Sequence, residues 1–203
     1  MTTEASRPGF DLKMTAEEIN RLPIAAYEGT VHVVRTQDAL EKAVHALRRE
    51  TVLGFDTETK PNFAKGENHP LSLIQFAGSR AVYIMQLRHM PSCDPLRKLF
   101  SDERIIKAGV DIPQDIVKLQ ERIGGGYKSF VDVSLGAKQA GLKNFSLRGL
   151  AAILLGVRIT KGMRVSNWAR DTLLPSQITY AATDAWISRE LYLRLQHPEA
   201  GTI

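Results

Sequence analysis

Two acidic residues, Asp56 and Glu58, end a hydrophobic run, VLGFDTETK, that spans residues 52–60. Side chains of a strand alternate between its two faces, so the two carboxylates share one face while Leu53 and Phe55 occupy the other. Two adjacent carboxylates repel each other unless a proton or a cation lies between them. Taken alone, the pair is typical of a strand end that faces water, but other acids in the chain favour a different interpretation.

Two further acids interrupt apolar faces of predicted helices. In DIPQDIVKL, Asp115 lies on the same face as Ile112, and in PSQITYAATDAWISRELYLRL, Asp184 lies on the same face as Ile187. A carboxylate buried without a partner is costly, so each acid needs a cation, a hydrogen-bond network or a metal. For either acid alone a structural salt bridge is an equally good explanation. Asp111 needs none of these, because its position predicts a helix N-cap.

Asp56, Glu58, Asp115 and Asp184 together form a candidate site of four inward-facing acids. Two divalent cations about 3.5–4 Å apart would relieve their repulsion and would support in-line phosphoryl displacement. Oxygen ligands favour Mg²⁺ or Mn²⁺ over zinc, and the five histidines show no pairing at ligand spacing. Tyr180 lies one turn before Asp184, so its hydroxyl could hold an attacking water; a core tyrosine with a satisfied hydroxyl would give the same pattern.

The composition is that of a single soluble globular domain. The 203 residues are 43% hydrophobic and 24% charged, which is enough for one well-cored domain. No apolar stretch reaches the roughly 18 residues of a membrane span, and the N-terminus lacks the pattern of a secretory signal. Cys93 is the single cysteine. We therefore expect a cytoplasmic protein with no membrane anchor, no disulfide-linked partner and no cysteine-based metal cluster.

The charge distribution points to a polyanionic partner. Lysine and arginine exceed aspartate and glutamate by 27 to 22, and residues 133–170 contain no acid. This acid-free segment carries seven basic residues: Lys138, Lys143, Arg148, Arg158, Lys161, Arg164 and Arg170. A solvated helical face would explain such a segment, but a long basic stretch in an otherwise mixed chain favours nucleic acid as the partner.

The expected architecture is a mixed α/β domain. Residues 1–29 form a leader with a short helix opened by a capping box of Thr15 and Glu18. Residues 30–198 form the main domain and 199–203 a short tail. Within the domain, TVLGFDTET, LSLIQFAGS and AVYIMQL predict three strands joined by short connections, which indicates an antiparallel meander. The rest of the chain is largely helical.

Three segments resemble, in order, the motifs of the DEDD superfamily of 3′–5′ exonucleases. They are FDTET, KAGVDIPQDIVKL and YAATDAWISRELY, and the Tyr-x-x-x-Asp form of the last is that of the tyrosine branch, DEDDy. The stretch SLRGLAAILLGVRITKGMRVSNWARDTLLPSQITYAATDA also resembles the exonuclease domain of the Werner syndrome protein. Ribonuclease D is similar but more distant, because SNW replaces its usual DW region.

The resemblance implies a role for each acid and a fold. Asp56, Glu58 and Asp184 would ligate the catalytic metal, Asp115 would help to hold a second one, partly through water, and Tyr180 would position the nucleophile. The cofactors would be two divalent cations, Mg²⁺ or Mn²⁺. Members of the family release nucleoside 5′-monophosphates one at a time from a 3′ end. The implied fold is ribonuclease-H-like: an antiparallel meander plus parallel strands in a mixed sheet, flanked by helices.

Four residues are candidates for contact with substrate. The backbone of Thr57 could meet the terminal nucleotide, although its side chain should face away from the acids. Phe63, in the segment KPNFAKGENHP, could stack on the terminal base or could pack under its own loop. Lys161 and Arg164 could contact phosphates or simply be solvated.

The expected substrate is a single-stranded or recessed 3′ end, with DNA slightly favoured. Two alternatives remain: an exoribonuclease that processes RNA 3′ ends, and a nucleic-acid-binding module without turnover. The oligomeric state is left open by the sequence.

Overall fold

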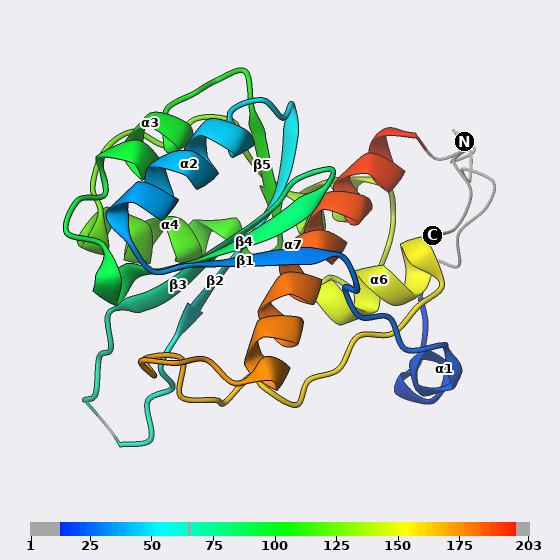
Figure 1. Cartoon of the computed structure of the whole chain (residues 1–203). Coiled ribbons are helices and arrows are strands. Elements are labelled where there is room, and N and C mark those ends of the chain that lie inside the picture. The colour runs from blue at the N-terminus through cyan, green and yellow to red at the C-terminus, as the bar shows by residue number, and fades with distance from the viewer. Residues whose placement is uncertain (1–12, 65, 198–203) are drawn as a thin grey trace.

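The computed structural model describes residues 13–64 and 66–197 (Figure 1). Its strands are β1 Thr30–Val34, β2 Val52–Thr59, β3 Leu71–Ala77, β4 Ala81–Gln86, β5 Ile106–Gly109 and β6 Phe130–Asp132. Its helices are α1 Ala16–Arg21, α2 Gln37–Leu47, the 3₁₀ turn η1 Leu87–His89, α3 Asp94–Phe100, α4 Ile112–Arg122, α5 Val133–Gln139, α6 Leu147–Leu155 and α7 Pro175–Gln196. The first twelve residues of the expected leader and the tail expected at 199–203 lie outside the described residues.

The strands form one mixed six-stranded sheet in the order β1-β4-β3-β2-β5-β6. The expected meander is confirmed, because β2 pairs antiparallel with β3 and β3 with β4. Strands β1, β5 and β6 extend the sheet by parallel pairing with β4, β2 and β5. Strand β6 was not expected, since its three residues are too few to show an alternating pattern; its pairing with β5 defines it.

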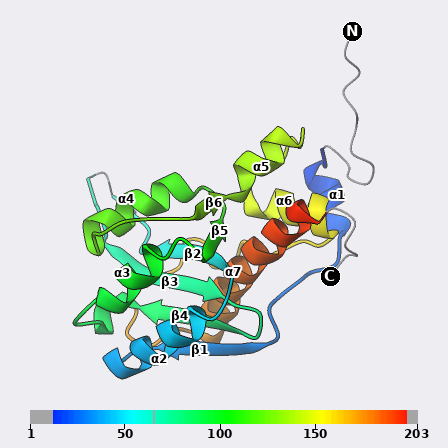
Figure 2. The ribbon, with the colours of Figure 1, turned by 90° about the horizontal axis from the view of Figure 1, so that it is seen from above.

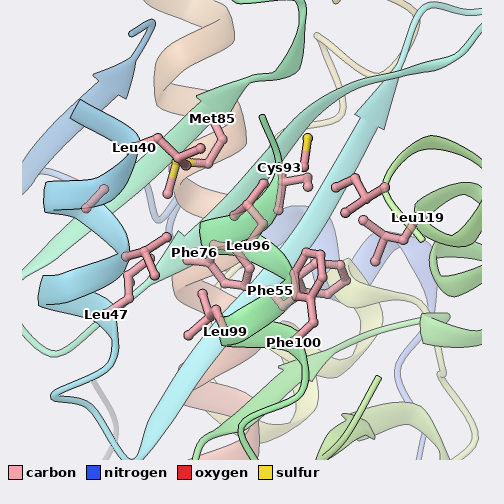
Figure 3. Packing of buried hydrophobic residues seen from close by; sticks show 14 of the residues in the cluster. Leu40, Leu47, Phe55, Phe76, Met85, Cys93, Leu96, Leu99, Phe100 and Leu119 are labelled. Carbon is pink, nitrogen blue, oxygen red and sulfur yellow. The ribbon is translucent and has the colours of Figure 1, made fainter. Parts of the chain in front are cut away.

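Helices cover both faces of the sheet (Figure 1, Figure 2). On one face, apolar residues of α2, α3 and α4 pack against β2, β3 and β4. Figure 3 shows this cluster, in which the Phe55 ring lies 5.6 Å from Phe76 and 5.2 Å from Phe130 between ring centroids. On the other face, α7 packs against β3 and β4 through small residues such as Ala181 and Ala185. Among residues 13–64 and 66–197, no helix is long and apolar enough to cross a membrane.

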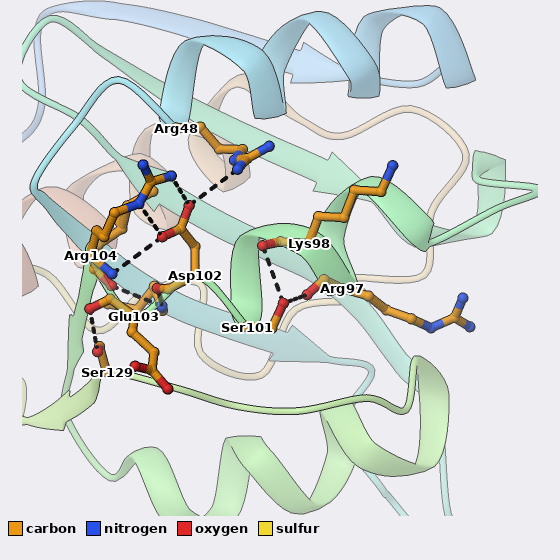
Figure 4. Close-up of polar contacts among 10 residues, drawn as sticks. Arg48, Arg97, Lys98, Ser101, Asp102, Glu103, Arg104 and Ser129 are labelled. Carbon is orange, nitrogen blue, oxygen red and sulfur yellow. Dashed lines mark hydrogen bonds and ion pairs between the residues drawn. The ribbon is translucent and has the colours of Figure 1, made fainter.

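The start of β5 is fixed by a group of polar contacts around Asp102 (Figure 4). The Asp102 carboxylate accepts hydrogen bonds from the guanidinium groups of Arg104 and Arg48. These bonds hold the pKa of Asp102 well below its usual range, and the bonds from Arg104 have the largest effect. The ammonium group of Lys107, a fully buried side chain, donates to the carbonyls of Asp102 and Ile105. Burial lowers the pKa of Lys107 to about 8. These contacts anchor the start of β5, the strand that leads into α4.

The leader packs on the side of the domain that carries α7. The expected capping box is confirmed, since the side chains of Thr15 and Glu18 each accept a hydrogen bond from the other residue's backbone. The Tyr27 N–H donates to the Thr183 hydroxyl of α7 at 3.0 Å. These contacts tie the residues before β1 to the face that carries α7.

Strand β2 and helix α7 approach so closely that a glycine is required between them. A Cβ atom added at Gly54 would lie 1.9 Å from the Ala185 carbonyl oxygen and 2.8 Å from the Arg189 backbone nitrogen. The Arg189 guanidinium donates to the Val52 carbonyl at 3.3 Å, which ties the two elements together. Because Gly54 and Asp56 share a face of β2, this contact sets the distance from α7 to the acids that follow.

We predict that Gly54→Ala destabilises the protein by at least about 3 kcal/mol, because the methyl group meets backbone atoms rather than a movable side chain. Gly126→Ala is the matched control, since a Cβ there meets nothing within 4 Å. Urea unfolding of both variants followed by circular dichroism measures the difference. A Gly54→Ala protein as stable as the control would show that the contact between β2 and α7 is looser than described.

Candidate active site

Three acids converge where the end of β2 meets α7. Asp56, Glu58 and Asp184 each offer a carboxylate oxygen, and these oxygens lie within 4.8 Å of one another. Asp184 is only 5% exposed, and the two strand acids are partly buried. The shared face of β2 that the alternation predicts is therefore the face that α7 covers, and the structure brings these three predicted residues together.

Asp115 reaches the same strand from the opposite layer. It lies in the first turn of α4, outside the group of three, and its carboxylate accepts a hydrogen bond from the Thr57 hydroxyl at 2.5 Å. The Thr57 side chain thus faces away from the other acids, as expected. The pairing of β2 with β5 ends at Gly54, so the edge of β2 beyond that point is open to the start of α4.

Burial raises the pKa values of all four carboxyl groups, and repulsion within the group adds to the shifts of Asp56 and Glu58. Burial raises the pKa of Glu58 to about 9, with the charges of Asp184 and Asp115 adding to the shift. Burial raises the pKa of Asp184 to about 7 and that of Asp115 to about 6. The pKa of Asp56 is raised by burial and then by the charges of the three other acids. A cluster of oxygen donors that resists ionisation without a cation fits a divalent metal site.

Tyr180 is joined to this group by a hydrogen bond to Asp184. The tyrosine lies one turn before Asp184 in α7, and burial together with the nearby acids raises its pKa above the ordinary value. Its ring lies 5.8 Å from that of Trp168, which is fully buried. The hydroxyl is therefore protonated at neutral pH and held at the edge of the acid cluster.

Two chain segments that carry predicted substrate residues lie at the end of the molecule where α7 begins (Figure 1). Phe63, in the segment after β2, is 76% exposed, so the alternative that it packs under its loop is wrong. Its backbone N–H donates to the Glu67 carboxylate at 2.8 Å, which shapes that loop. Lys161 and Arg164, in the segment before α7, are both exposed.

The segment before α7 is held in place by a buried glutamine. The Gln177 amide nitrogen donates to the Ser166 hydroxyl at 2.8 Å and to the Asn167 carbonyl at 3.1 Å. Its amide oxygen accepts from the Leu174 N–H at 2.9 Å. These bonds give the segment before α7, which carries Lys161 and Arg164, a defined position beside Tyr180.

Lys118 is a residue of the site that the sequence analysis did not identify. Its ammonium group lies 3.4 Å from the Thr59 hydroxyl, and its charge lowers the pKa of both Glu58 and Asp115. The sequence held one signal for Lys118: it follows Asp115 by three residues, and residues i and i+3 share a helix face. The same spacing is common on solvated helices.

Asp111 departs from its predicted role. It occupies the N-cap position of α4, but its side chain makes no capping hydrogen bond and its backbone is left-handed, with φ of 66°. N-cap side chains reach the first helical N–H groups from an extended backbone, which Asp111 lacks. Its charge instead adds to the raised pKa of Asp115.

Solved structures with this arrangement of strands and helices are ribonuclease-H-like exonuclease domains. The EXO domain of Aedes aegypti Nibbler superposes with a TM-score of 0.77 at 24% identity, covering 86% of this chain and 94% of that one. Escherichia coli RNase D superposes with a TM-score of 0.76 at 21% identity, covering 82% and 44%. At these identities the likeness concerns the fold alone, and it confirms the expected fold class.

Sequence comparison places the chain in the same class. Residues 31–198 match the family model described as 3′-5′ exonuclease. The chain is 33% identical over 164 residues to Exonuclease 3'-5' domain-containing protein 2 of Drosophila melanogaster, covering 79% of this chain and 28% of that protein. It is 33% identical over 151 residues to the bifunctional 3'-5' exonuclease/ATP-dependent helicase WRN of Mus musculus, covering 71% and 11%.

The chain therefore belongs to the 3′-5′ exonuclease family, and the resemblance found in its three motifs is confirmed. It spans only about a quarter of the Drosophila relative and a tenth of the mouse one.

We predict that the metal-free protein loses stability as the pH rises from about 4 to 9. Acids with a raised pKa bind more protons in the folded state than in the unfolded state, so stability falls between their ordinary pKa values and the raised values of about 6, 7 and 9. Thermal melts in EDTA across this range measure the slope.

Asp184→Asn removes one of the repelling charges, so the metal-free variant should be more stable than the wild type at pH 8, by about 1 kcal/mol or more. Asp38→Asn, at an exposed position on α2, is the control for a general charge effect. A variant at Asp184 with the same pH slope as the wild type would contradict the repulsion described above.

Proposed function

We propose that residues 30–198 form a metal-dependent 3′–5′ exonuclease domain that releases nucleoside 5′-monophosphates from nucleic acid 3′ ends. The observation that carries the proposal is the convergence of Asp56, Glu58 and Asp184 within 4.8 Å, with Asp115 and Tyr180 hydrogen-bonded to its edge. Family membership supports it, since the relatives named above carry this activity in their names.

Asp56, Glu58 and Asp184 would hold one divalent cation, and Asp115 would help to hold a second, partly through water. Mg²⁺ or Mn²⁺ suits an all-oxygen donor set. When bound, the cations would supply Lewis-acid polarisation of the scissile phosphate and lower the pKa of the attacking water. Their positive charge also offsets the repulsion that raises the pKa values of the free acids.

Tyr180 would orient the attacking water. Its raised pKa keeps the hydroxyl protonated, so it cannot serve as a base at neutral pH. Its O–H donates to Asp184, while a lone pair on the same oxygen can accept a hydrogen bond from water. Attack on phosphorus breaks the bond to the 3′ oxygen of the preceding nucleotide, and the released unit keeps its 5′ phosphate.

The substrate strand would enter between the segment that carries Phe63 and the segment that carries Lys161 and Arg164. Phe63 is exposed enough to stack on a base, and the two basic side chains can contact phosphates. The backbone of Thr57 would meet the terminal nucleotide. Lys118 adds a positive charge next to the acids, and its ammonium group can contact a phosphate while it stays beside the Thr59 hydroxyl.

DNA and RNA are both candidate substrates. The sequence favours DNA slightly. RNA is favoured by the structure of Trypanosoma brucei RNase D in complex with RNA U12, which superposes on this chain with a TM-score of 0.73. The proposed chemistry is the same for both, so the two polymers become arms of one experiment.

We predict that the protein shortens 5′-labelled oligonucleotides from the 3′ end in Mg²⁺ or Mn²⁺ but not in EDTA. The substrates are single-stranded DNA, duplex DNA with a recessed 3′ end and single-stranded RNA. Asp56→Asn should abolish the ladder because a ligand oxygen is lost, whereas the exposed Asp38→Asn should keep it. Intact substrate in every lane with a shifted band on a native gel would instead indicate a binding module without turnover.

Tyr180→Phe should lower the single-turnover rate by about 10- to 100-fold, because the water loses its orienting hydroxyl. The variant should still bind Mn²⁺, since all four carboxylates remain. Tyr83→Phe, which removes the hydroxyl of a partly buried tyrosine on β4, is the matched control and should keep the wild-type rate. An unchanged rate for Tyr180→Phe would remove the hydroxyl from the proposed mechanism.

A further inference from the structure

Gln75 is the residue directly opposite Asp56 in the ladder of β2 and β3. Opposite residues of an antiparallel pair point to the same face, with Cβ atoms about 4.5–5.5 Å apart. The Gln75 side chain therefore lies beside Asp56 on the face that α7 covers. The adjacent pair on this face, Glu58 and Leu73, shows the usual arrangement: the next acid of β2 has an apolar neighbour on β3.

The Gln75 amide is buried without a hydrogen-bond partner. The residue is 0% exposed, and within the described residues neither its amide nitrogen nor its amide oxygen is bonded. Its other neighbours on this face of the sheet, Leu73, Ala77 and Ile84, are buried and apolar. An unpaired amide in such a place costs free energy that an apolar side chain of the same size would not.

Two other buried glutamines on this side of the molecule have a clear structural use. Gln177 bonds to Ser166, Asn167 and Leu174 as described, and the Gln86 amide nitrogen donates to the carbonyls of Arg170 and Asp171 at 3.1 and 3.2 Å. Both glutamines hold the segment before α7. Gln75 makes no such bond, so its polar group needs a different explanation, and the polar group opposite it is Asp56.

We propose that Gln75 is a positioning residue whose amide nitrogen donates a hydrogen bond to the Asp56 carboxylate when that carboxylate holds a divalent cation. The inference rests on the proposed function. A ligating carboxylate is oriented by hydrogen bonds to atoms outside the metal's own ligands. The Thr57 backbone N–H already provides one to Asp56, and Gln75 provides a second from the neighbouring strand.

An amide suits this position because it is a donor without charge. A lysine or arginine opposite Asp56 would form an ion pair with it and compete with the cation for the carboxylate. An apolar residue would leave the carboxylate free to rotate. Gln75 orients the carboxylate while leaving the negative charge of the four acids available to metal, at the cost of an unpaired amide in the metal-free protein.

Gln75→Met separates this role from simple packing, because methionine fills a similar volume without a donor. We expect about tenfold weaker Mn²⁺ binding by calorimetry on the full chain without nucleic acid, in line with other residues that orient metal ligands. We also expect the Tm of the metal-free variant to rise by about 2–4 °C, because an unpaired buried amide is removed. A packing residue would show the opposite change in Tm.

Gln86→Met is the matched control: the same substitution at a buried glutamine on the adjacent strand. It removes two hydrogen bonds to the segment before α7, so its Tm in EDTA should fall, while its Mn²⁺ affinity should stay within about twofold of wild type, the size of a minor change in binding free energy. Asp56→Asn provides the reference for loss of a ligand. The two glutamine variants should therefore shift the Tm in EDTA in opposite directions, and only Gln75→Met should weaken Mn²⁺ binding markedly.

Gln75→Met with wild-type Mn²⁺ affinity, or with a lowered Tm in EDTA, would overturn the inference. Wild-type protein that binds no Mn²⁺ would instead overturn the proposed function. Should the variant not fold, the side-chain amide resonances of Gln75 in wild-type protein decide the matter by NMR. They should shift and exchange more slowly with solvent when Mg²⁺ is added; unchanged resonances at saturating Mg²⁺ would exclude the hydrogen bond.

Discussion

The close approach of α7 to β2 is the constraint on which the site depends. Gly54 lets the Ala185 carbonyl lie against the strand backbone, and Asp184 is the residue just before Ala185. The acids of β2 lie two and four positions after Gly54, on the same face. A looser contact would separate the carboxylate of the helix from those of the strand, and the three oxygens would no longer lie within reach of a single cation.

In this arrangement the acids repel one another, and the packing of the rest of the fold must offset that cost in free energy. Four carboxyl groups have raised pKa values, so each costs free energy when it ionises in the absence of a cation. The opposite face of the same strand contributes the largest buried cluster, which includes Leu53 and Phe55. Burial of the apolar face of β2 can therefore hold the strand in place when no metal is bound to the acids at its end.

The sequence predicted the local geometry of the site well, because local periodicity determined it. Alternation placed Asp56 and Glu58 on one face, and helical spacing placed Tyr180 and Asp184 together. Long-range neighbours were not predictable in this way. LSLIQFA reads as a continuous buried strand, so Gln75 became notable only when the register set it opposite Asp56. The same limit applies to Lys118, whose relation to Glu58 depends on how α4 meets the end of β2.

Strand β2 also explains how one site draws on both layers of the domain. Its even-numbered residues face α7, so Asp56 and Glu58 meet Asp184, while Thr57 faces the other way and bonds Asp115 of α4. The open edge beyond the last pair with β5 makes this second contact available. Asp115 therefore lies outside the group formed by Asp56, Glu58 and Asp184. Because its carboxylate is set apart from that group, Asp115 suits the second of the two cations that we propose rather than the ion held by the other three acids.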